Sequence, residues 1–374
     1  MIYLDYSATT PVNKDVLDTF NKCCLDFIGN PNSLHKLGVN SKNLIDNATK
    51  QMASILNVKE EEIIYTSGAS ESNNMAIKGI CLKYQNRGKH IITTNLEHSS
   101  IYGPISYLRK QGFTVDFVSL DENGLVDIEN LKSLIKDDTI LVSIASVNSE
   151  IGIRQNIEEI GSLLKNYPKC FFHVDMTQSI GKIKIPLDNV DLMSFSAHKF
   201  YGIKGIGVLY KKEKIDIEPL IHGGKSTTIY RSGTPMLPLI VSTSKALRLA
   251  YEDLDKKYDH VLNLNKYLKE KLSNYKNVYI NSNDKCIPFV LNISVVGIKP
   301  ETMLHALEEK DIYISTQSAC STANKSLAVY SITNSDERAL SSIRISLSYL
   351  TTKEEINLFL EAFDECYNKL MLRS

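Results

Sequence analysis

The sequence predicts an α/β fold built on a mostly parallel sheet, followed by a smaller α+β portion. Apolar runs that suit strands alternate with turns and helical patterns between residues 63 and 210, as in a sheet flanked by helices. After residue 272, the strands VYIN, FVLNISV and IYIST accompany two further helical patterns. A length of 374 residues with 43% hydrophobic content also fits one large domain plus a smaller one.

The composition narrows the class of protein. Lys and Arg together number 43, as do Asp and Glu, so no whole-molecule field draws the chain to nucleic acid or to an anionic membrane. Asp5 interrupts the stretch that a signal peptide would need, and no run approaches the roughly 18 apolar residues of a membrane span. We therefore expect a cytoplasmic protein that binds neither membrane nor nucleic acid directly.

The cysteines predict no structural cross-link. There are seven of them, an odd number, and no CxxC pair. Neither a disulfide framework nor a zinc site is indicated, so we predict no bound metal.

The first elements are an arm, a loop and a helix. YLDYSATTP, within residues 1–15, favours turns over a helix at Thr9, Thr10 and Pro11. Residues 30–38 form a polar loop, after which a helical pattern runs from Leu44 to Ile55.

The next motif suits an anion. A strand from Ile63 to Thr66 runs into Ser67-Gly68-Ala69-Ser70, where a helix begins. Free backbone N–H groups and the positive end of a helix dipole then lie together, which favours phosphate. Alone this signal is weak, because Ser70 and Asn73 also suit ordinary helix capping.

Two more strand ends carry polar groups. HIITTNLEHSS, residues 90–100, ends in Glu97 and His98, and a lone histidine there is more often structural than catalytic. TVDFVSL, the helix DIENLKSLI and the strand ILVSIASVNSEIG follow. The last of these places Asn148 and Glu150 at its carboxyl end, where open α/β sheets bind ligands. A helix over 156–167 precedes the next strand.

A carboxylate and a lysine end the two strands that follow. HVDMTQ, residues 173–178, contains Asp175, and SFSAHK, residues 194–199, contains Lys199. A lone lysine is usually a surface residue, but one with a lowered pKa forms a Schiff base with an aldehyde cofactor. A carboxylate at a strand end can hold the pyridinium nitrogen of such a cofactor.

The pair HVDMTQ and SFSAHK resembles the pyridoxal phosphate site of the class V aminotransferases, and most closely that of the cysteine desulfurases. The resemblance covers nearly the whole chain, with further motifs in the same order. It implies fold type I of the pyridoxal-phosphate-dependent transferases. We expect an N-terminal arm over 1–15 that joins the small domain, a large cofactor-binding domain over 16–255 and a small domain over 256–374.

The resemblance also implies roles for residues near the cofactor. Lys199 would hold pyridoxal phosphate covalently and then remove the substrate's Cα proton, while His98 stacks on the ring and moves protons. Asp175 would bind the ring nitrogen, and Gln178 and Asn148 would contact the ring oxygen and the substrate. The phosphate ligands that the resemblance implies are Ala69, Ser70, Ser196 and His198 of the same subunit. Thr234 of a neighbouring subunit would complete the set.

Thr234 belongs to RSGT, residues 231–234, which in the family reaches into the partner's site and so implies a homodimer with shared active sites. The chain departs from the family just before this motif. Residues 226–230 read STTIY, where family members usually carry a Glu and an Arg.

A second reactive residue is expected at Cys320. It stands in STQSACSTANKS, a polar stretch where a thiol can ionise and act as a nucleophile, and which resembles the family's SGSAC loop. Arg344, in SSIRIS, can bind a substrate carboxylate through two parallel hydrogen bonds; a surface ion pair is the alternative. The segment between the two residues is shorter than in well-known family members.

Together these features predict a cysteine desulfurase that converts L-cysteine to L-alanine and carries the sulfur as a persulfide on Cys320. An iron–sulfur scaffold or a tRNA or cofactor thiolation enzyme would accept the sulfur. Two alternatives stay open: another class V enzyme, such as a selenocysteine lyase or an aminotransferase, and a sulfur-relay partner with little catalysis of its own.

Overall fold

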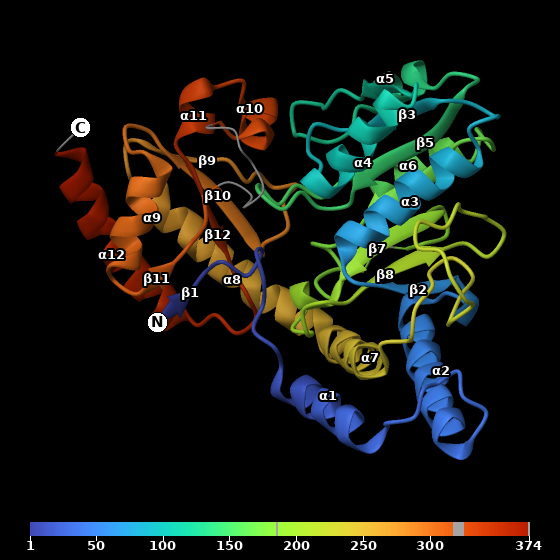
Figure 1. Cartoon of the computed structure of the whole chain (residues 1–374). Helices are drawn as coiled ribbons and strands as arrows, with labels where there is room; N and C mark the ends of the chain where they lie inside the picture. Colours follow the sequence, from blue (N-terminus) through green and yellow to red (C-terminus); the bar gives the residue numbers. More distant parts are fainter. Residues whose placement is uncertain (185, 317–324, 373–374) are drawn as a thin grey trace.

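The computed structural model describes residues 1–184, 186–316 and 325–372. A seven-stranded sheet forms its centre, in the order β2-β8-β7-β6-β5-β3-β4 (Figure 1). Only β8 runs antiparallel to its neighbours, so the sheet is mixed and mostly parallel, as predicted. The strands are β2 (Ile63–Thr66), β3 (His90–Thr93), β4 (Thr114–Phe117), β5 (Thr139–Ala145), β6 (Phe171–Asp175), β7 (Leu192–Ser196) and β8 (Gly207–Lys211).

Helices cover both faces of this sheet (Figure 1). Helices α3 (Ala69–Lys83) and α4 (Ser99–Lys110) bury Met75 and Ile105 in one apolar cluster with Ile64. The residues beside Ile64 point to the other face, because successive side chains of a strand alternate. That face carries α1 (Lys14–Asp26), α2 (Lys36–Leu56), α6 (Ile157–Leu164) and α7 (Leu237–Tyr251), and α5 (Ile128–Leu134) packs at its edge.

The C-terminal part has its own sheet and its own apolar cluster. The antiparallel sheet has the order β12-β10-β9, with β9 (Val278–Ile280), β10 (Val290–Val295) and β12 (Ser342–Ser346). The helices of this part are α8 (Leu254–Leu272), α9 (Pro300–Glu308), α10 (Leu327–Thr333), α11 (Asp336–Leu340) and α12 (Lys353–Met371). Val261, Leu291 and Phe359 lie together in a cluster separate from those of the large sheet.

The N-terminal arm connects these two parts. Its strand β1 (Ile2–Tyr3) pairs in parallel with β11 (Ile312–Tyr313), and Asp5 forms a β-bridge with Ser346. Farther along the arm, the backbone N–H of Thr10 donates to the carbonyl of His198 at 2.9 Å, beside the end of β7. The arm therefore crosses from the C-terminal part to the large sheet.

The helical pattern over 237–272 divides into two helices. α7 ends at Tyr251 and α8 begins at Leu254, because Asp253 adopts a left-handed conformation with φ of 50°. The sequence predicted a bend near Asp255; the domain boundary placed there stays a prediction. None of the helices in the described ranges combines the length and hydropathy that a membrane span requires.

Several helices were not expected from the sequence, among them α4 and α1. α4 contains Gly103-Pro104, a pair that signals a turn, yet the helix continues through it. α1 buries only Val16 and Cys23 among its 13 residues, so it has little apolar periodicity to detect.

Candidate active site

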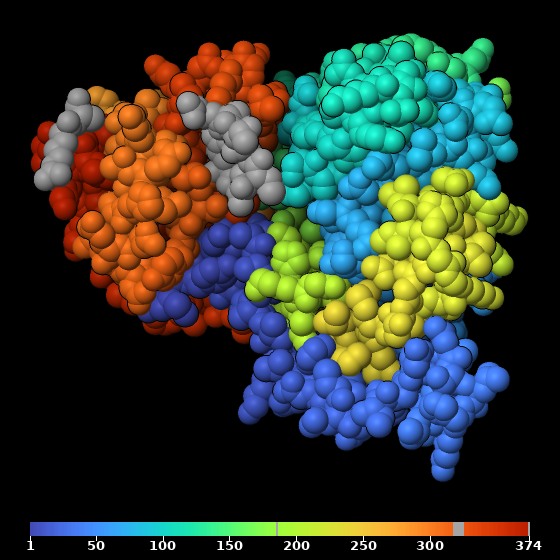
Figure 2. Space-filling view, in the orientation of Figure 1, coloured from blue at the N-terminus to red at the C-terminus, as the bar shows by residue number. Residues whose placement is uncertain are grey.

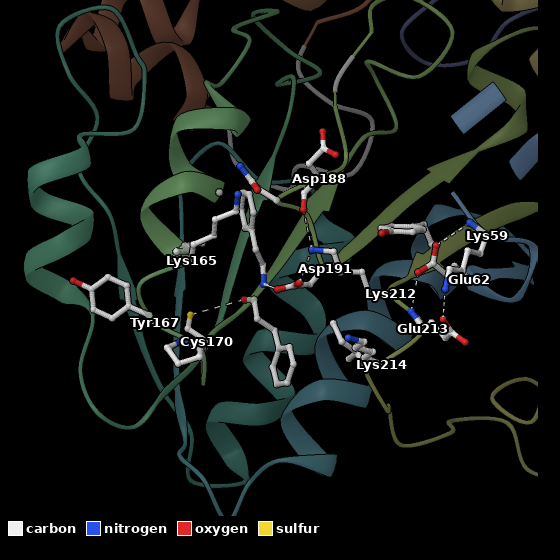
Figure 3. Close-up of a pocket in the computed structure, with 18 residues that line it drawn as sticks. Lys59, Glu62, Lys165, Tyr167, Cys170, Asp188, Asp191, Lys212, Glu213 and Lys214 are labelled. Atoms are coloured by element: carbon white, nitrogen blue, oxygen red, sulfur yellow. Dashed lines mark hydrogen bonds and ion pairs between the residues drawn. The ribbon is translucent and has the colours of Figure 1, made fainter. Parts of the chain in front are cut away.

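A cavity of about 520 Å³ lies at the carboxyl ends of β5, β6 and β7. The predicted site residues that line it are Ala69, Ser70, His98, Asp175, Gln178, Ser196, His198, Lys199 and Arg344. They come from the large sheet, the turns that follow its strands, and β12. Another cavity, of about 480 Å³, lies near the start of β6 and is lined by Lys59, Asp191 and Lys212 among others, but by no predicted site residue (Figure 3).

The N-terminus of α3 forms one end of the larger cavity. The helix begins at Ala69 after Gly68, without a side-chain cap, so its first N–H groups have no acceptor within the helix. A Cβ built on Gly207 would stand 2.5 Å from the Gly68 carbonyl carbon, whereas one on Gly205 would meet nothing within 4 Å. The backbone thus packs tightly behind an open cradle suited to a phosphate.

Asp175, at the end of β6, is anchored by two donors. Its Oδ1 accepts from the N–H of Thr177 at 2.9 Å, and its Oδ2 accepts from Asn73 Nδ2 at 2.8 Å. The capping role considered for Asn73 is therefore wrong, since its side chain points inward from α3 to this carboxylate.

The same asparagine reaches His98 through a serine. Asn73 Nδ2 donates to Ser100 Oγ at 2.8 Å, and Ser100 Oγ lies 2.8 Å from His98 Nδ1. That nitrogen also accepts from the Ser100 N–H at 3.1 Å, which assigns the proton of a neutral ring to Nε2. Burial, with the charge of Lys199, lowers the pKa of His98 although Asp175 opposes the shift.

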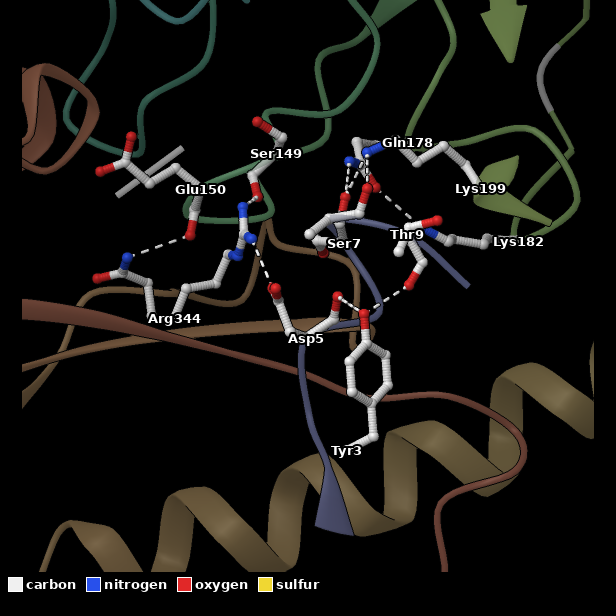
Figure 4. Close-up of polar contacts among 12 residues, drawn as sticks. Tyr3, Asp5, Ser7, Thr9, Ser149, Glu150, Gln178, Lys182, Lys199 and Arg344 are labelled. Atoms are coloured by element: carbon white, nitrogen blue, oxygen red, sulfur yellow. Dashed lines mark hydrogen bonds and ion pairs between the residues drawn. The ribbon is translucent and has the colours of Figure 1, made fainter. Parts of the chain in front are cut away.

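Lys199 follows β7 on a single 3-10 turn, Ala197–Lys199, and contacts the N-terminal arm (Figure 4). Its Nζ donates to the carbonyls of Ser7 at 2.5 Å and Ala8 at 2.8 Å. His198 Nδ1 lies 3.2 Å from Thr9 Oγ1. Burial, followed by the charges of Lys199 and nearby lysines, lowers the pKa of His198 to about 4, so this ring stays neutral.

Arg344 is only 3% exposed, so the alternative of a surface ion pair does not describe it. Its Nη2 donates to Asp5 Oδ1 at 2.7 Å and its Nη1 to the carbonyl of Ser149 at 3.1 Å (Figure 4). Its Nε is buried and has no hydrogen-bond partner among the described residues. A guanidinium with an unused donor suits an additional anion.

Two predicted residues of the described part of the chain, Asn148 and Thr234, do not line this cavity. The Asn148 amide holds its own turn, with Oδ1 accepting from the N–H groups of Glu150 and Ile151 and Nδ2 donating to the carbonyl of Leu96. Thr234 is exposed on the surface of this subunit. Cys320 lies outside the described residues. Their roles stay predictions.

The sequence analysis missed three side chains of this region. Asn73 lies 102 positions from Asp175, and Asp5 lies 339 positions from Arg344. Lys182 is buried beside Gln178 and bonds to its side chain. Only Asn73 had a usable signal, as a polar residue two positions before the apolar run Met75-Ala76-Ile77 of α3.

Comparisons with known proteins agree with this geometry. The family model for aminotransferase class-V matches residues 2–359. The cysteine desulfurase IscS of Buchnera aphidicola subsp. Acyrthosiphon pisum is 44% identical over 365 residues, covering 95% of this chain and 90% of its own.

Solved structures are similar over nearly the whole chain. A NifS-like protein superposes with a TM-score of 0.93 at 34% identity, covering 98% of this chain and 99% of its own. A structure of SspA in complex with cysteine superposes with a TM-score of 0.83 at 32% identity, covering 94% of this chain and 100% of its own. The predicted fold and family are confirmed. The chain belongs to the class-V aminotransferase family, in which its full-length relatives include cysteine desulfurases of the IscS type and NifS-like proteins.

Proposed function

We propose that this protein is a pyridoxal-phosphate-dependent cysteine desulfurase that forms L-alanine from L-cysteine and transfers the sulfur to Cys320. The proposal rests on one observation, which is that Lys199, Asp175 and Arg344 line the same cavity. An amine, an anchored carboxylate and a guanidinium are the groups needed to hold an aldehyde cofactor and an amino acid carboxylate. The relative SspA, whose structure contains cysteine, supports the substrate.

The donors present fit pyridoxal phosphate. The uncapped start of α3, with Ala69, Ser70 and the open side of Gly205, offers N–H groups to a phosphate. Two hydrogen bonds anchor the Asp175 carboxylate within the described part of the chain, which leaves lone pairs for a ring N–H. His98, flat and neutral, suits stacking on the ring. Bound there, the cofactor would supply an aldehyde carbon for amines and an electron-withdrawing ring that stabilises negative charge at the substrate Cα.

Side chains of the protein itself have separate roles in the proposed reaction. Arg344 binds the substrate carboxylate through its unused Nε, and Asp175 keeps a proton on the ring nitrogen. Lys199 Nζ, once released, takes the Cα proton and is held near the arm by the carbonyls of Ser7 and Ala8. His98 holds a proton on Nε2, because Nδ1 is occupied by Ser100.

Sulfur transfer is assigned to Cys320 by the family resemblance. Its thiolate attacks the substrate sulfur; a C–S bond breaks, an S–S bond forms, and a proton replaces sulfur on the substrate carbon. L-Cysteine plus one thiol therefore gives L-alanine plus one persulfide, and the atoms balance without an external oxidant. An iron–sulfur scaffold or a thiolation enzyme in the cytoplasm is the proposed acceptor.

A homodimer with shared sites is proposed on two further features. Thr234 is exposed and lies outside the lining of its own subunit's cavity, so it is placed to serve a partner. The end of α1, the start of α2 and the turn between them expose apolar side chains on a part of the molecule that projects from the body (Figure 2). These are Leu25, Ile28, Leu34 and Leu37. Burying them against a second copy would remove an exposed apolar patch.

Alanine and sulfide release from L-cysteine, measured with a reductant, tests the proposal. Wild type is expected to give equal amounts of the two products, and Cys320→Ser and Lys199→Ala neither. Cys320→Ser should still bind the cofactor, which the visible absorbance reports. Product formation that survives Cys320→Ser, or amino transfer to a keto acid, would favour the selenocysteine lyase or aminotransferase alternative. A wild-type protein that binds no cofactor would favour the relay alternative.

A further inference from the structure

Lys182 is a buried cation that the proposed reaction does not use. It lies in the turn after β6, is 7% exposed, and points toward the arm and the cavity wall (Figure 4). Its Nζ donates to Gln178 Oε1 at 2.9 Å and lies 5.9 Å from the centre of the Phe289 ring. Within the described part of the chain, it forms no ion pair with a carboxylate.

This contact fixes the orientation of the Gln178 amide. An ammonium can only donate, so the amide oxygen must face Lys182. Gln178 Nε2 then donates one hydrogen to the carbonyl of Ser7 at 3.0 Å. Its second hydrogen is left for the cavity that Gln178 lines. Gln178 consequently offers the cavity a donor and not an acceptor.

The charges around Lys182 are mostly of its own sign. Burial, followed by the positive charges of Lys199 and Arg344, lowers its pKa to about 7. Lys182 in turn is one of the charges that lower the pKa of His198. A buried cation among cations is costly to fold, and an anionic oxygen nearby would relieve that cost.

We propose that Lys182 is a positioning residue that locks Gln178 as a hydrogen-bond donor toward the ring oxygen of bound pyridoxal phosphate. Its positive charge also stabilises the anionic form of that oxygen. The inference rests on the proposed function, because it needs a cofactor whose ring oxygen lies at Gln178. It assigns no chemical step to Lys182 itself.

Lys182→Met tests this role, because methionine keeps an unbranched apolar stem and removes the charge and the donor. The matched control is Lys184→Met, an exposed lysine two positions away. The holoenzyme's visible band is followed against pH, and cofactor affinity is measured by equilibrium dialysis. Because Lys182→Met removes a nearby positive charge, the pH at which the visible band is half converted should rise by about one unit. Cofactor binding should weaken about tenfold. The control should change neither.

Two further variants separate positioning from a structural role. Lys182→Arg should restore most of both properties, since a guanidinium also donates to Gln178. In a Gln178→Met background, Lys182→Met should weaken cofactor binding little further, because this effect acts through the amide, whereas the shift of the band, which comes from the charge, should persist. Thermal unfolding of the apoprotein should be no easier in Lys182→Met than in wild type, since a buried charge has been removed.

The inference is overturned by an unchanged band and affinity in Lys182→Met, by losses of cofactor affinity that add fully to that of Gln178→Met, or by a loss confined to apoprotein stability. Failure of the proposed function gives a different result: wild type itself would then show no visible band with pyridoxal phosphate, or would form no alanine and sulfide from L-cysteine. The two failures are therefore distinguishable in one set of preparations.

Discussion

Arg344 and Asp5 are joined by a hydrogen-bonded ion pair in which Nη2 donates to Oδ1 at 2.7 Å. The side chain proposed to bind the substrate carboxylate thus already holds a carboxylate from the chain's own arm. Both contacts use the same guanidinium, so the arm and the substrate are expected to compete for its charge.

Asp5→Asn should lower the KM for L-cysteine about threefold, because an amide keeps the shape of the contact but removes the competing charge. Steady-state kinetics measure this. Asp18→Asn is the control, as an exposed acid on α1 away from Arg344. A rise in KM would instead mean that the Asp5 charge serves to orient the guanidinium.

Glu97 gives the protein a specific pH dependence. Its Oε1 accepts from Thr94 Oγ1 and the Ala145 N–H, while Oε2 is buried without a partner among the described residues. Burial raises its pKa to about 8, with Asp175 adding to the shift. Between its unfolded pKa and pH 8 the folded state binds the extra proton, so this group's contribution to stability falls as pH rises.

Glu97→Gln should therefore unfold at a higher temperature than wild type at pH 8.5 and at about the same temperature at pH 5. Glutamine mimics the protonated acid and keeps the accepting oxygen, and the difference grows by up to about 1.4 kcal/mol per pH unit. Thermal unfolding of the apoprotein at several pH values measures it. Glu122→Gln, at a turn on the surface, is the control. A constant difference at every pH would contradict the raised pKa.

Gly207 and Gly103 form a matched pair for testing the phosphate cradle. Gly207→Ala would place a methyl group 2.5 Å from the Gly68 carbonyl carbon, so the turn before α3 must shift. Cofactor affinity should fall about tenfold or more, and the protein should be destabilised by roughly 1–3 kcal/mol. Equilibrium dialysis and thermal unfolding measure the two effects.

Gly103→Ala, in α4, meets nothing within 4 Å and should stabilise the protein by about 1 kcal/mol, since alanine favours a helix. Its cofactor affinity should equal that of wild type. Equal behaviour of the two variants would show that the close approach at Gly207 does not shape the cradle.

The dimer proposal predicts a change of oligomeric state. Ile28 is 78% exposed and lies beside other exposed apolar residues at the turn between α1 and α2. Ile28→Asp should convert the dimer to monomers, because a charge would have to be buried at the interface. Leu358→Asp, on α12, should leave the dimer intact. Light scattering after size exclusion distinguishes the two, and a wild-type monomer would contradict the proposal.

The sequence predicted elements best where one apolar pattern continued without interruption. The strand that ends at Ser196 is buried throughout, and the strand that ends at Asp175 is buried except at Phe171. Polar turns bound both strands, so their carboxyl ends could be predicted and the site residues assigned to them. α1 and α4 were missed because sparse burial and a Gly-Pro pair hide their periodicity.

Contacts between distant segments were not predictable from the sequence. The approach of Asn73 to Asp175 depends on how α3 packs on the sheet, and that of Asp5 to Arg344 on the pairing of β1 with β11. Neither distance is encoded in a local pattern. No local pattern signals the burial of Lys182, because burial of a charged side chain is decided by tertiary packing.

The crossing of the N-terminal arm bears on how the protein is made. Ser7 and Ala8, whose carbonyls hold Lys199, are translated some three hundred positions before β11, which fixes the register of the arm. The arm must therefore wait for its partner strand until β11 has been translated. A nascent fragment that lacks β11 cannot complete the wall of the cavity. A chain truncated before β11 would therefore be unable to begin the proposed reaction.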